Sequence, residues 1–398
     1  MRIGVVAGSR SPEEGGGFTF SKAVVDAIKA CSSSHEFIIW GSEIFERERW
    51  RELVKRAGDS VGAGRLIRST ARLIRSVQAV VAVGGVSPIE QFIRDSEIDI
   101  VWFLAPGEPV SVPYIATVWD LQHRRQPFFP EVSTTGLTWE ARERAFGSSL
   151  PRASRIITGT QAGKDEIVAF YGVSSENVMI VPLPVAVSDH TTGADSRIDV
   201  RTKYALKRDF LLYPAQFWPH KNHVNLLLAL DLIKRDADVE LDLVLTGSDK
   251  GNLDHVSQIV ATLGLTSQVH ILGFVPKADL HELYREAVCL AFASFFGPDN
   301  IPPLEAFALS CPVVAARVPG SEEQLGNAAL LFDPTNPADI ARTILTVRRD
   351  CRVRAELTRL GKEIIAARSP RAYVEQICRI LDEFEPIRRC WGRHYWHA

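Results

Sequence analysis

The chain has 398 residues, of which 46% are apolar and 24% are charged, and its formal net charge is −2. This length exceeds what one compact core usually holds, so two domains are expected. The near-neutral charge gives no basis for nucleic-acid binding, which needs a clearly basic face. No apolar run approaches the roughly 18 residues that a membrane span requires.

The six cysteines are far apart and include no CxxC pair. This spacing argues against both a metal centre and a disulfide framework. The sequence opens on an apolar strand pattern rather than on a signal peptide, so a cytoplasmic enzyme is expected. The segment 387–396 mixes arginines with aromatic residues, a composition that suits peripheral contact with the inner face of a membrane. A disordered tail is the alternative interpretation of that segment.

Apolar strands alternate with helix-period segments along the chain, which predicts parallel sheets covered by helices. In the first half the predicted strands are Ile3–Ala7, Phe37–Trp40, Ala79–Val83, Ile98–Leu104, Tyr114–Val118, Ile156–Gly159 and Val178–Val181. In the second half they are Phe210–Pro214, Leu241–Thr246, Val269–Leu272, Val288–Ala293 and Pro312–Ala316. Helices are predicted to begin at Lys221 and Asn252 and to cover Ala278–Ala287, Pro302–Leu309, Pro337–Arg349, Val353–Ala367 and Pro370–Phe384.

A polar segment, 185–201, has no clear period and separates the two series of strands. The predicted fold class is therefore α/β, with two Rossmann-like domains. Residues 1–185 form the first domain, 186–203 the linker and 204–370 the second domain. Residues 371–398 are predicted to form a final helix, which packs back across the N-terminal domain, and a tail.

Three glycines, Gly15, Gly16 and Gly17, follow the first strand and precede a helix. Glycine lets a backbone approach a ligand closely, so these residues are candidates for an acceptor or phosphate loop. A flexible loop is an equally weighted alternative, since the spacing is not that of a GxGxxG fingerprint.

Polar residues also follow the strand Tyr114–Val118, where Asp120 and His123 occur in the sequence VWDLQH. Ligands of open α/β sheets bind at the carboxyl ends of strands. Either residue could orient or deprotonate an acceptor hydroxyl, because a carboxylate or an imidazole can accept a proton. The alternative is that Asp120 caps a turn and His123 lies on the surface.

The segment 213–223, YPAQFWPHKNH, places Lys221 at a predicted helix start. A lysine there opposes the helix dipole unless an anion offsets it, and a diphosphate would do so. His220 and His223 flank this lysine without a third ligand, so no metal site is predicted.

The segment 291–316 reads AFASFFGPDNIPPLEAFALSCPVVAA, a strand, a loop and a helix that opens with two prolines. The first turn of a helix favours an anion through its amides and its dipole. Glu305 lies in that turn and could accept a hydrogen bond from a sugar hydroxyl. Together these groups suit a nucleotide-sugar.

With these segments the chain resembles the retaining glycosyltransferases of family 4, which have the GT-B architecture of two Rossmann-like domains facing a central cleft. The resemblance extends over nearly the whole length. It is carried by the segment around Lys221, by LGFV at 272–275, and by FFGPDNIPPLEA at 295–306, a variant of the family pattern EGFGLPxLEA.

The resemblance assigns roles on the donor side. Lys221 would hold the donor diphosphate together with the amides of Asn300 and Ile301, and Glu305 would hold the donor ribose. The first glutamate of the family pattern falls at Gly297, so Asp299 or Asn300 would replace its contact with the transferred sugar.

Other positions are assigned in the same way. The backbone of Phe274 and Val275 would contact the nucleobase, and Gly247 lies in a strand-end loop where backbone could approach a flat ring. Gln216 stands where the family usually has an arginine, and Trp119 stands where many members have histidine. His123 is the candidate that would compensate for the latter change.

The activity implied is transfer of a hexose, mannose or a deoxyhexose, from a nucleotide-sugar such as GDP-mannose to a glycan or lipid-linked acceptor with retention. No DxD-type motif occurs beside the donor segments, so transfer without metal or cofactor is expected. A catalytically weak nucleotide-sugar binder is one alternative, motivated by Gly297 and Gln216. A GT-B nucleotide-sugar epimerase is another, and a nicotinamide oxidoreductase is disfavoured because no strand-linked GxGxxG occurs.

Overall fold

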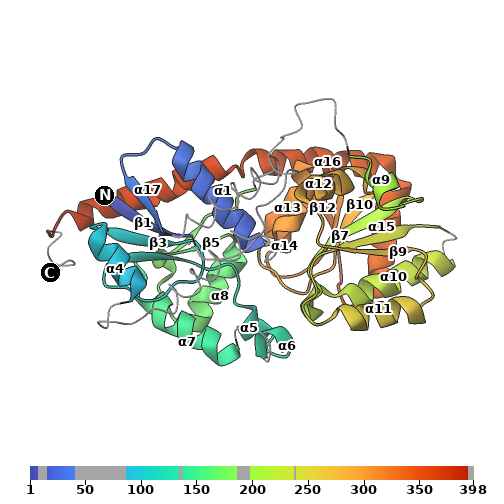
Figure 1. Cartoon of the computed structure of the whole chain (residues 1–398), viewed down its shortest axis with the longest axis horizontal. Coiled ribbons are helices and arrows are strands. Elements are labelled where there is room, and N and C mark those ends of the chain that lie inside the picture. Colours follow the sequence, from blue (N-terminus) through green and yellow to red (C-terminus); the bar gives the residue numbers. More distant parts are fainter. Residues whose placement is uncertain (8–15, 41–86, 134–137, 186–197, 237–238, 393–398) are drawn as a thin grey trace, which may run out of the picture.

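The computed structural model describes residues 1–7, 16–40, 87–133, 138–185, 198–236 and 239–392. Two lobes lie side by side along the long axis of the molecule, and each is built around a parallel sheet (Figure 1). The predicted strand Ala79–Val83 and the linker residues 186–197 lie outside the described residues.

The N-terminal lobe contains a six-stranded sheet in which all pairings are parallel. Its strands are β1 (Arg2–Val6), β2 (Glu36–Trp40), β3 (Ile100–Phe103), β4 (Tyr114–Thr117), β5 (Arg155–Thr158) and β6 (Val178–Ile180), in the order β2-β1-β3-β4-β5-β6. Its helices are α1 (Gly16–Ala30), α4 (Pro88–Asp95), α5 (Gln122–Arg125), α6 (Pro130–Ser133), α7 (Trp139–Ser149) and α8 (Gln161–Tyr171), with the 3-10 turns η2 (Leu150–Arg152) and η3 (Ser175–Asn177).

The C-terminal lobe contains a second six-stranded parallel sheet. Its strands are β7 (Phe210–Pro214), β8 (Asp242–Thr246), β9 (Val269–Gly273), β10 (Cys289–Phe292), β11 (Val313–Ala316) and β12 (Ala329–Phe332), in the order β12-β11-β10-β7-β8-β9. Its helices are α9 (Val200–Lys203), α10 (His223–Asp236), α11 (Leu253–Thr262), α12 (Lys277–Glu286), α13 (Ile301–Ala308), α14 (Ser321–Leu325), α15 (Pro337–Arg349) and α16 (Cys351–Ala366), with the turns η4 (Pro219–Lys221) and η5 (Gly326–Ala328).

The strand order of the C-terminal sheet is that of a doubly wound Rossmann fold. The chain starts in the centre at β7, proceeds outward through β8 and β9, and then returns to the other side of β7 with β10. The order therefore reverses between β7 and β10, and ligands of such sheets bind beyond the carboxyl ends of the strands at this switch point. The segments that follow these two strands are accordingly the place to look for a site.

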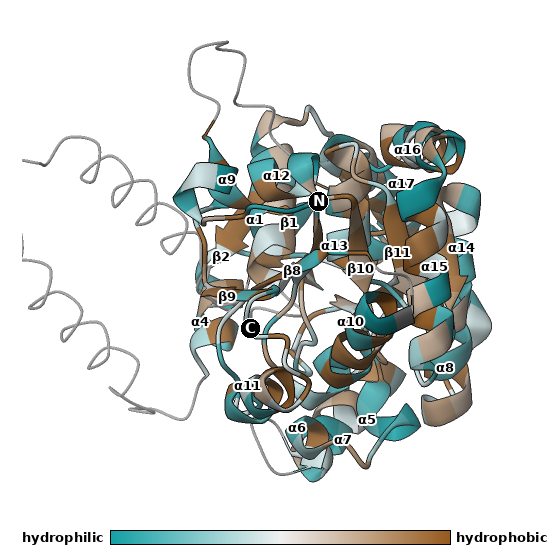
Figure 2. Cartoon of the chain, turned by 90° about the vertical axis from the view of Figure 1, so that its right-hand side faces the viewer, coloured by the Kyte–Doolittle hydropathy of each residue, from teal (hydrophilic) through white to brown (hydrophobic). Residues whose placement is uncertain are grey.

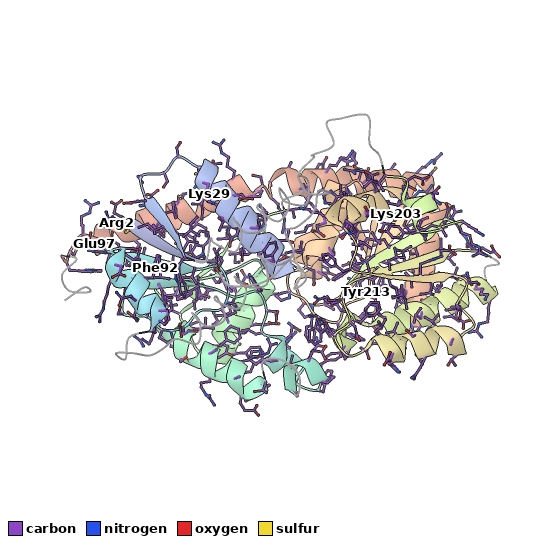
Figure 3. The ribbon with its side chains drawn as sticks, in the orientation of Figure 1. Arg2, Lys29, Phe92, Glu97, Lys203 and Tyr213 are labelled. Atoms are coloured by element: carbon purple, nitrogen blue, oxygen red, sulfur yellow. The ribbon has the colours of Figure 1, made fainter. Side chains whose placement is uncertain are left out.

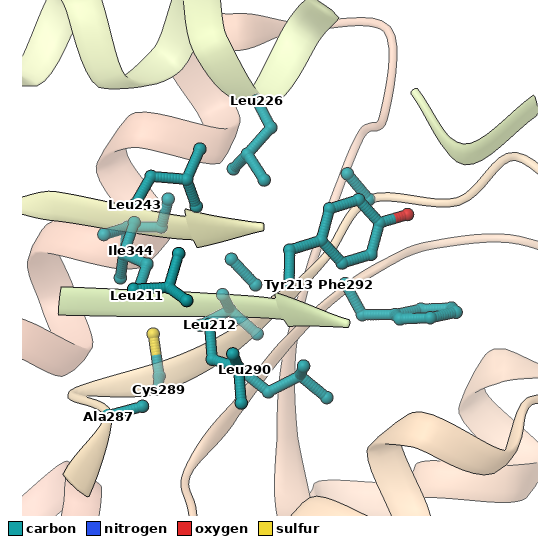
Figure 4. Close-up of a cluster of buried hydrophobic side chains, with 14 of the residues drawn as sticks. Leu211, Leu212, Tyr213, Leu226, Leu243, Ala287, Cys289, Leu290, Phe292 and Ile344 are labelled. Carbon is teal, nitrogen blue, oxygen red and sulfur yellow. The ribbon is translucent and has the colours of Figure 1, made fainter. Parts of the chain in front are cut away.

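The core of the C-terminal lobe explains why its strands read as continuous apolar runs. Leu211 and Leu212 are neighbours in β7, so their side chains point to opposite faces of the sheet, yet both are fully buried. Figure 4 shows them among packed side chains from several elements, including Leu226 of α10, Leu290 of β10 and Ile344 of α15. A parallel sheet with both faces covered has no polar face, and this removes the alternation.

Helices around the sheets carry both hydrophilic and hydrophobic residues (Figure 2). The last helix, α17 (Pro370–Arg388), runs back along the N-terminal lobe, beside α1 (Figure 1). Its Tyr373, Val374, Ile377 and Leu381 are buried in the core of that lobe. The prediction of a final helix that packs on the N-terminal domain is therefore confirmed, whereas the residue boundaries of the domains stay a prediction.

Two predictions about elements need correction. The helix predicted from Lys221 begins at His223, because Asn222 adopts a left-handed conformation (φ 58°) after the short turn η4. The strand β12 was not predicted, although ALLF at 329–332 pairs in parallel with β11. A four-residue apolar run between two turns gives little periodic signal.

Candidate functional site

The segment after β7 brings Lys221 to the switch point of the C-terminal sheet. Tyr213, labelled in Figure 3, lies near the end of β7 and donates a hydrogen bond from its hydroxyl to the Lys221 carbonyl at 2.6 Å. The ammonium is half-buried and lies 5.6 Å from the centroid of the Phe292 ring. Burial lowers the pKa of Lys221 to about 8, while the carboxylates of Asp120 and Glu131 act in the opposite direction. Both carboxylates belong to the N-terminal lobe, so Lys221 faces the seam between the lobes.

Gln216 lies in the same segment, and its side chain is engaged within the lobe. Its Nε2 donates to Ser248 Oγ at 3.2 Å, and its Oε1 accepts from Trp218 Nε1 at 3.0 Å. These contacts tie the segment after β7 to the segment after β8. The predicted role of Gln216 in donor binding stays a prediction. Because glutamine is uncharged, this position adds no positive charge to that of Lys221.

The segment after β10 offers fewer anion-binding amides than expected. Pro302 and Pro303 carry no N–H, and the Asn300 N–H donates to Gln324 Oε1 at 3.1 Å. In this structure a side chain of α14 already accepts from the Asn300 amide, and the predicted contact of that amide with a phosphate stays a prediction. The Ile301 side chain meets the N-terminal lobe at Gly16, where a Cβ would lie 3.2 Å from Ile301 Cδ1.

Glu305, in the first turns of α13, is half-buried. The Tyr284 hydroxyl donates to Glu305 Oε2 at 3.2 Å. Burial raises the pKa of Glu305, although this hydrogen bond and the positive charge of Lys277 oppose the change. The carboxylate thus keeps acceptor capacity beside the switch point, as the predicted ribose contact requires.

Asp299 follows β10 in the C-terminal lobe, but its carboxyl group reaches the N-terminal lobe. A Cβ placed on Gly159, just after β5, would lie 1.6 Å from Asp299 Oδ2, so only glycine leaves room for this contact. Gln324 donates to Asp299 Oδ1. Burial raises the pKa of Asp299 to about 7, against the opposing charge of Arg368. The geometry makes Asp299 an interlobe contact, and its proposed contact with a transferred sugar stays a prediction.

The ends of β8 and β9 shape the remaining donor side. Gly247 has φ 139° and leaves no room for a side chain, since a Cβ would lie 2.5 Å from the Ala215 carbonyl oxygen. Its N–H donates to the Gly273 carbonyl at 2.8 Å. The next residue, Phe274, is 61% exposed, whereas Val275 is buried. The predicted contact of the Phe274 and Val275 backbone with a nucleobase stays a prediction.

On the N-terminal lobe, Asp120 follows β4 and is half-buried. Its Oδ1 accepts a hydrogen bond from the Gln122 N–H at 3.1 Å, so it does cap the turn into α5. Glu166 of α8 is buried nearby, and Arg125 Nε lies 3.2 Å from Glu166 Oε1. Burial raises the pKa of Glu166 to about 7, Arg125 opposes this, and Asp120 adds to it. Sequence reasoning missed Glu166, because nothing in the helix pattern marks it.

The expectation that His123 faces an acceptor is wrong for this structure. His123 is fully buried, its Nε2 lies 2.7 Å from Glu143 Oε1, and its ring stacks on Phe146 with centroids 5.5 Å apart. Tyr171 and Arg124 share the same Glu143 carboxylate. Burial lowers the pKa of His123, although Glu143 acts in the opposite direction. Its partners all lie within its own lobe, so His123 anchors α5 to α7 and α8.

Of the three glycines near the N-terminus, Gly15 lies outside the described residues, while Gly16 and Gly17 open α1. As described above, Gly16 meets Ile301 of the other lobe. A ligand-binding role for this loop stays a prediction.

Two carboxylates join the lobes and were not predicted. Glu131 Oε1 of α6 accepts from both the His220 backbone N–H, at 2.9 Å, and its ring Nδ1, at 2.5 Å. In the opposite direction, Glu323 of α14 accepts from the Gln161 N–H at 2.6 and 2.8 Å, which satisfies the first turn of α8. Their signal is absent from the sequence because each partner is distant along the chain.

A possible metal position occurs away from this seam. Among the described residues, His35, Asp382 and Glu385 have ligand atoms within 4.8 Å of one another. His35 comes just before β2, at the amino ends of the strands, whereas Asp120 lies at the carboxyl ends. The expectation of transfer without metal stays a prediction. In the part of the chain that is described, no helix is both long enough and apolar enough to cross a membrane.

The two facing Rossmann-like lobes, closed by a final helix on the first lobe, are the GT-B architecture of glycosyltransferases. The structure is similar to that of Anabaena Alr3699/HepE in complex with UDP and glucose, with a TM-score of 0.68, 16% identity and coverage of 96% of this chain and 100% of that chain. At this identity the likeness concerns the fold.

Residues 196–364 match the family model "Glycosyl transferases group 1". A similar curated protein is O-antigen chain mannosyltransferase B of Escherichia coli, 28% identical over 52% of this chain and 55% of that protein. Another is the D-inositol 3-phosphate glycosyltransferase of Corynebacterium kroppenstedtii, 27% identical over 50% of this chain and 46% of that protein. The chain thus spans about half the length of these relatives.

Proposed function

We propose that the protein transfers a hexose from a nucleotide-sugar donor to a hydroxyl group of a glycan or lipid-linked saccharide. The observation that carries this proposal is the place of Lys221, a half-buried ammonium at the switch point of the C-terminal sheet. Among the described residues it makes no ion pair within 4.0 Å, so a diphosphate could pair with it directly. The family match over 196–364 supports the same activity.

The chemistry follows from where charge develops. Negative charge grows on the diphosphate as the glycosidic bond breaks, and a positioned ammonium in a partly water-excluded site stabilises that change. Asp120, across the seam, would accept a hydrogen bond from the attacking hydroxyl. Retention of configuration, by a front-face route with the leaving diphosphate as proton acceptor, is the proposed stereochemistry, and no metal is required by it.

The proposed donor sugar is mannose, from GDP-mannose, with a bacterial surface polysaccharide as the destination. The support is the similarity to a relative named as an O-antigen chain mannosyltransferase. A lipid-linked acceptor would bring the protein to a membrane surface without a spanning helix.

The test is a donor screen on the purified protein. GDP-, UDP- and dTDP-sugars are compared by thermal shift and by slow donor hydrolysis, each with and without EDTA. We expect stabilisation by GDP-mannose, turnover that EDTA leaves unchanged, and loss of both in Lys221→Ala. Lys207→Ala is the matched control, because Lys207 is exposed and lies before β7, at the opposite edge of the sheet.

A catalytically weak nucleotide-sugar binder is the second candidate function. It is favoured by one observation, the uncharged Gln216 held by Ser248 and Trp218 beside the phosphate position. Nucleotide binding without hydrolysis or transfer to any acceptor would support it. Absence of any thermal shift with all three nucleotide classes would contradict both functions.

A further inference from the structure

We propose that Glu131 of the N-terminal lobe is a positioning residue for the donor diphosphate, which acts by holding His220 and thereby the adjacent Lys221. This inference rests on the proposed function, and it adds a residue of the opposite lobe to the donor site. This residue was not among those predicted from the sequence.

The contact is a two-point attachment on a single residue. Glu131 Oε1 accepts from the backbone N–H of His220 at 2.9 Å and from its ring Nδ1 at 2.5 Å. Both groups are buried, with 6% of Glu131 and 8% of His220 exposed. A carboxylate that accepts from Nδ1 requires the proton on that nitrogen, so the contact assigns the tautomer of His220. Burial lowers the pKa of His220 to about 4, which leaves the imidazole neutral at pH 7.

His220 in turn joins the two segments that form the switch point. Its carbonyl accepts from the Phe295 N–H at 2.9 Å, and its ring lies flat on Phe296, with centroids 3.8 Å apart and an interplanar angle of 9°. Phe129, two residues before Glu131, packs against both phenylalanines. The segments after β7 and β10 therefore share one support, and Glu131 fixes that support from the other lobe.

Lys221 directly follows His220 in the chain, and its own carbonyl accepts a hydrogen bond from the Tyr213 hydroxyl. The backbone on both sides of the lysine is thus fixed, and its ammonium remains directed toward the acidic groups across the seam. The charged or titratable groups that act on the lysine, or on which it acts, are Asp120, Glu131, His220 and His223, with Arg142 acting on His220. Glu131 thus has two effects on Lys221, one through hydrogen bonds to His220 and one through its charge.

These two effects are separable by substitution. Glu131→Gln keeps one oxygen that accepts from the His220 N–H groups and removes the negative charge, while an NH2 group replaces the buried Oε2. Glu131→Ala removes the acceptor as well. Glu140→Gln and Glu140→Ala are matched controls, because Glu140 is an exposed carboxylate on the adjacent helix α7.

The experiment measures the Kd for GDP, and KM and kcat for the donor that the screen identifies, from pH 6 to 9.5, together with Tm. We expect Glu131→Ala to raise the Kd and the donor KM by about tenfold at pH 7, as the loss of two hydrogen bonds to one positioned residue implies. We expect Glu131→Gln to bind normally at pH 6.5, but with the alkaline loss of affinity shifted by about half a pH unit toward lower pH.

A merely structural contact between the lobes gives a different result. In that case Tm falls in Glu131→Ala while Kd, KM and the pH midpoint stay within twofold or 0.2 unit of wild type, and the inference is overturned. If Glu131→Ala does not fold, Glu131→Asp takes its place, because its shorter side chain withdraws the acceptor from His220, and an unchanged Kd in that variant overturns the inference. If the wild type binds no nucleotide, the proposed function fails and this inference fails with it. If the wild type binds nucleotide and the Glu131 variants bind it equally well, the proposed function stands and only this inference fails.

Discussion

Two segments of the molecule occupy equivalent positions in the two lobes, but their polar side chains point in different directions. The segment after β4 carries His123, and the segment after β7 carries Lys221, each beyond the carboxyl end of a parallel strand. His123 turns into its own lobe and is paired with Glu143, whereas Lys221 faces the opposite lobe. Position at a strand end is therefore not sufficient for a role at the seam, because the direction in which the side chain is buried decides whether it faces the other lobe.

The largest expected effect breaks the donor side of this comparison. Lys221→Ala is expected to reduce kcat/KM for the nucleotide-sugar by about 100-fold or more, because under the proposed function it removes the cation that stabilises the leaving diphosphate. Steady-state kinetics with Lys207→Ala as control measure the effect. A loss below about threefold would mean that the ammonium does not contact the diphosphate.

The opposite outcome is expected for His123→Ala. This change removes a buried ring stacked on Phe146 and should lower the free energy of unfolding by about 2 kcal/mol. Activity per folded molecule should stay within about threefold of wild type, because the ring does not reach the seam. Chemical denaturation and active-site-normalised kinetics separate the two readouts. A stable variant with a large loss of kcat would restore the acceptor role that the sequence suggested for His123.

The pH dependence of nucleotide binding sharpens the comparison. Burial lowers the pKa of Lys221 to about 8, so the ammonium that we propose as the diphosphate ligand loses its charge as pH rises above 8. The association constant should fall toward a limit of about tenfold per pH unit above that point. Isothermal titration with GDP from pH 7 to 9.5 tests this, and Lys221→Ala should show a weak and nearly flat profile.

The smallest expected effect concerns Glu166 on the acceptor side. Burial raises its pKa in the folded protein to about 7, above the unfolded value, so the folded state binds more protons between about pH 4.5 and 7. Stability from this group is therefore present at low pH and is lost as pH rises through 7. Glu166→Gln should remove the loss, so its Tm relative to wild type should be higher at pH 8 than at pH 5 by about 2 °C. Equal differences at the two pH values would contradict the prediction.

The sequence predicted the strands correctly where helices cover both faces of the sheet. β7 and β10 read as unbroken apolar runs because helices cover both faces of the sheet, and both were predicted close to their observed bounds. β12 was missed because four apolar residues between turns fit a strand no better than a turn. Lys221 was identified through a predicted helix start, although the helix begins two residues later, at His223.

The candidate site was accessible only in part, for a reason that particular residues make clear. Lys221, Glu305 and Asp120 could be located because a strand end and a polar residue are both visible in a linear pattern. Glu131 and Glu323 could not, since each bonds a backbone N–H of the other lobe more than 80 residues away in the chain. The sequence cannot distinguish such a carboxylate from one on a solvated surface.

The amino-acid sequence by itself thus determined the two parallel α/β sheets, their order along the chain and the segments that end at the carboxyl edges. Periodicity and turn residues encode these features locally. Only the tertiary structure decided that His123 is buried away from the seam, that Gln324 already uses the Asn300 amide, and that Glu131 holds the segment before Lys221. These outcomes depend on which surfaces come into contact when the two lobes and the final helix pack together. Such contacts join residues that are distant along the chain, so no local sequence pattern specifies them.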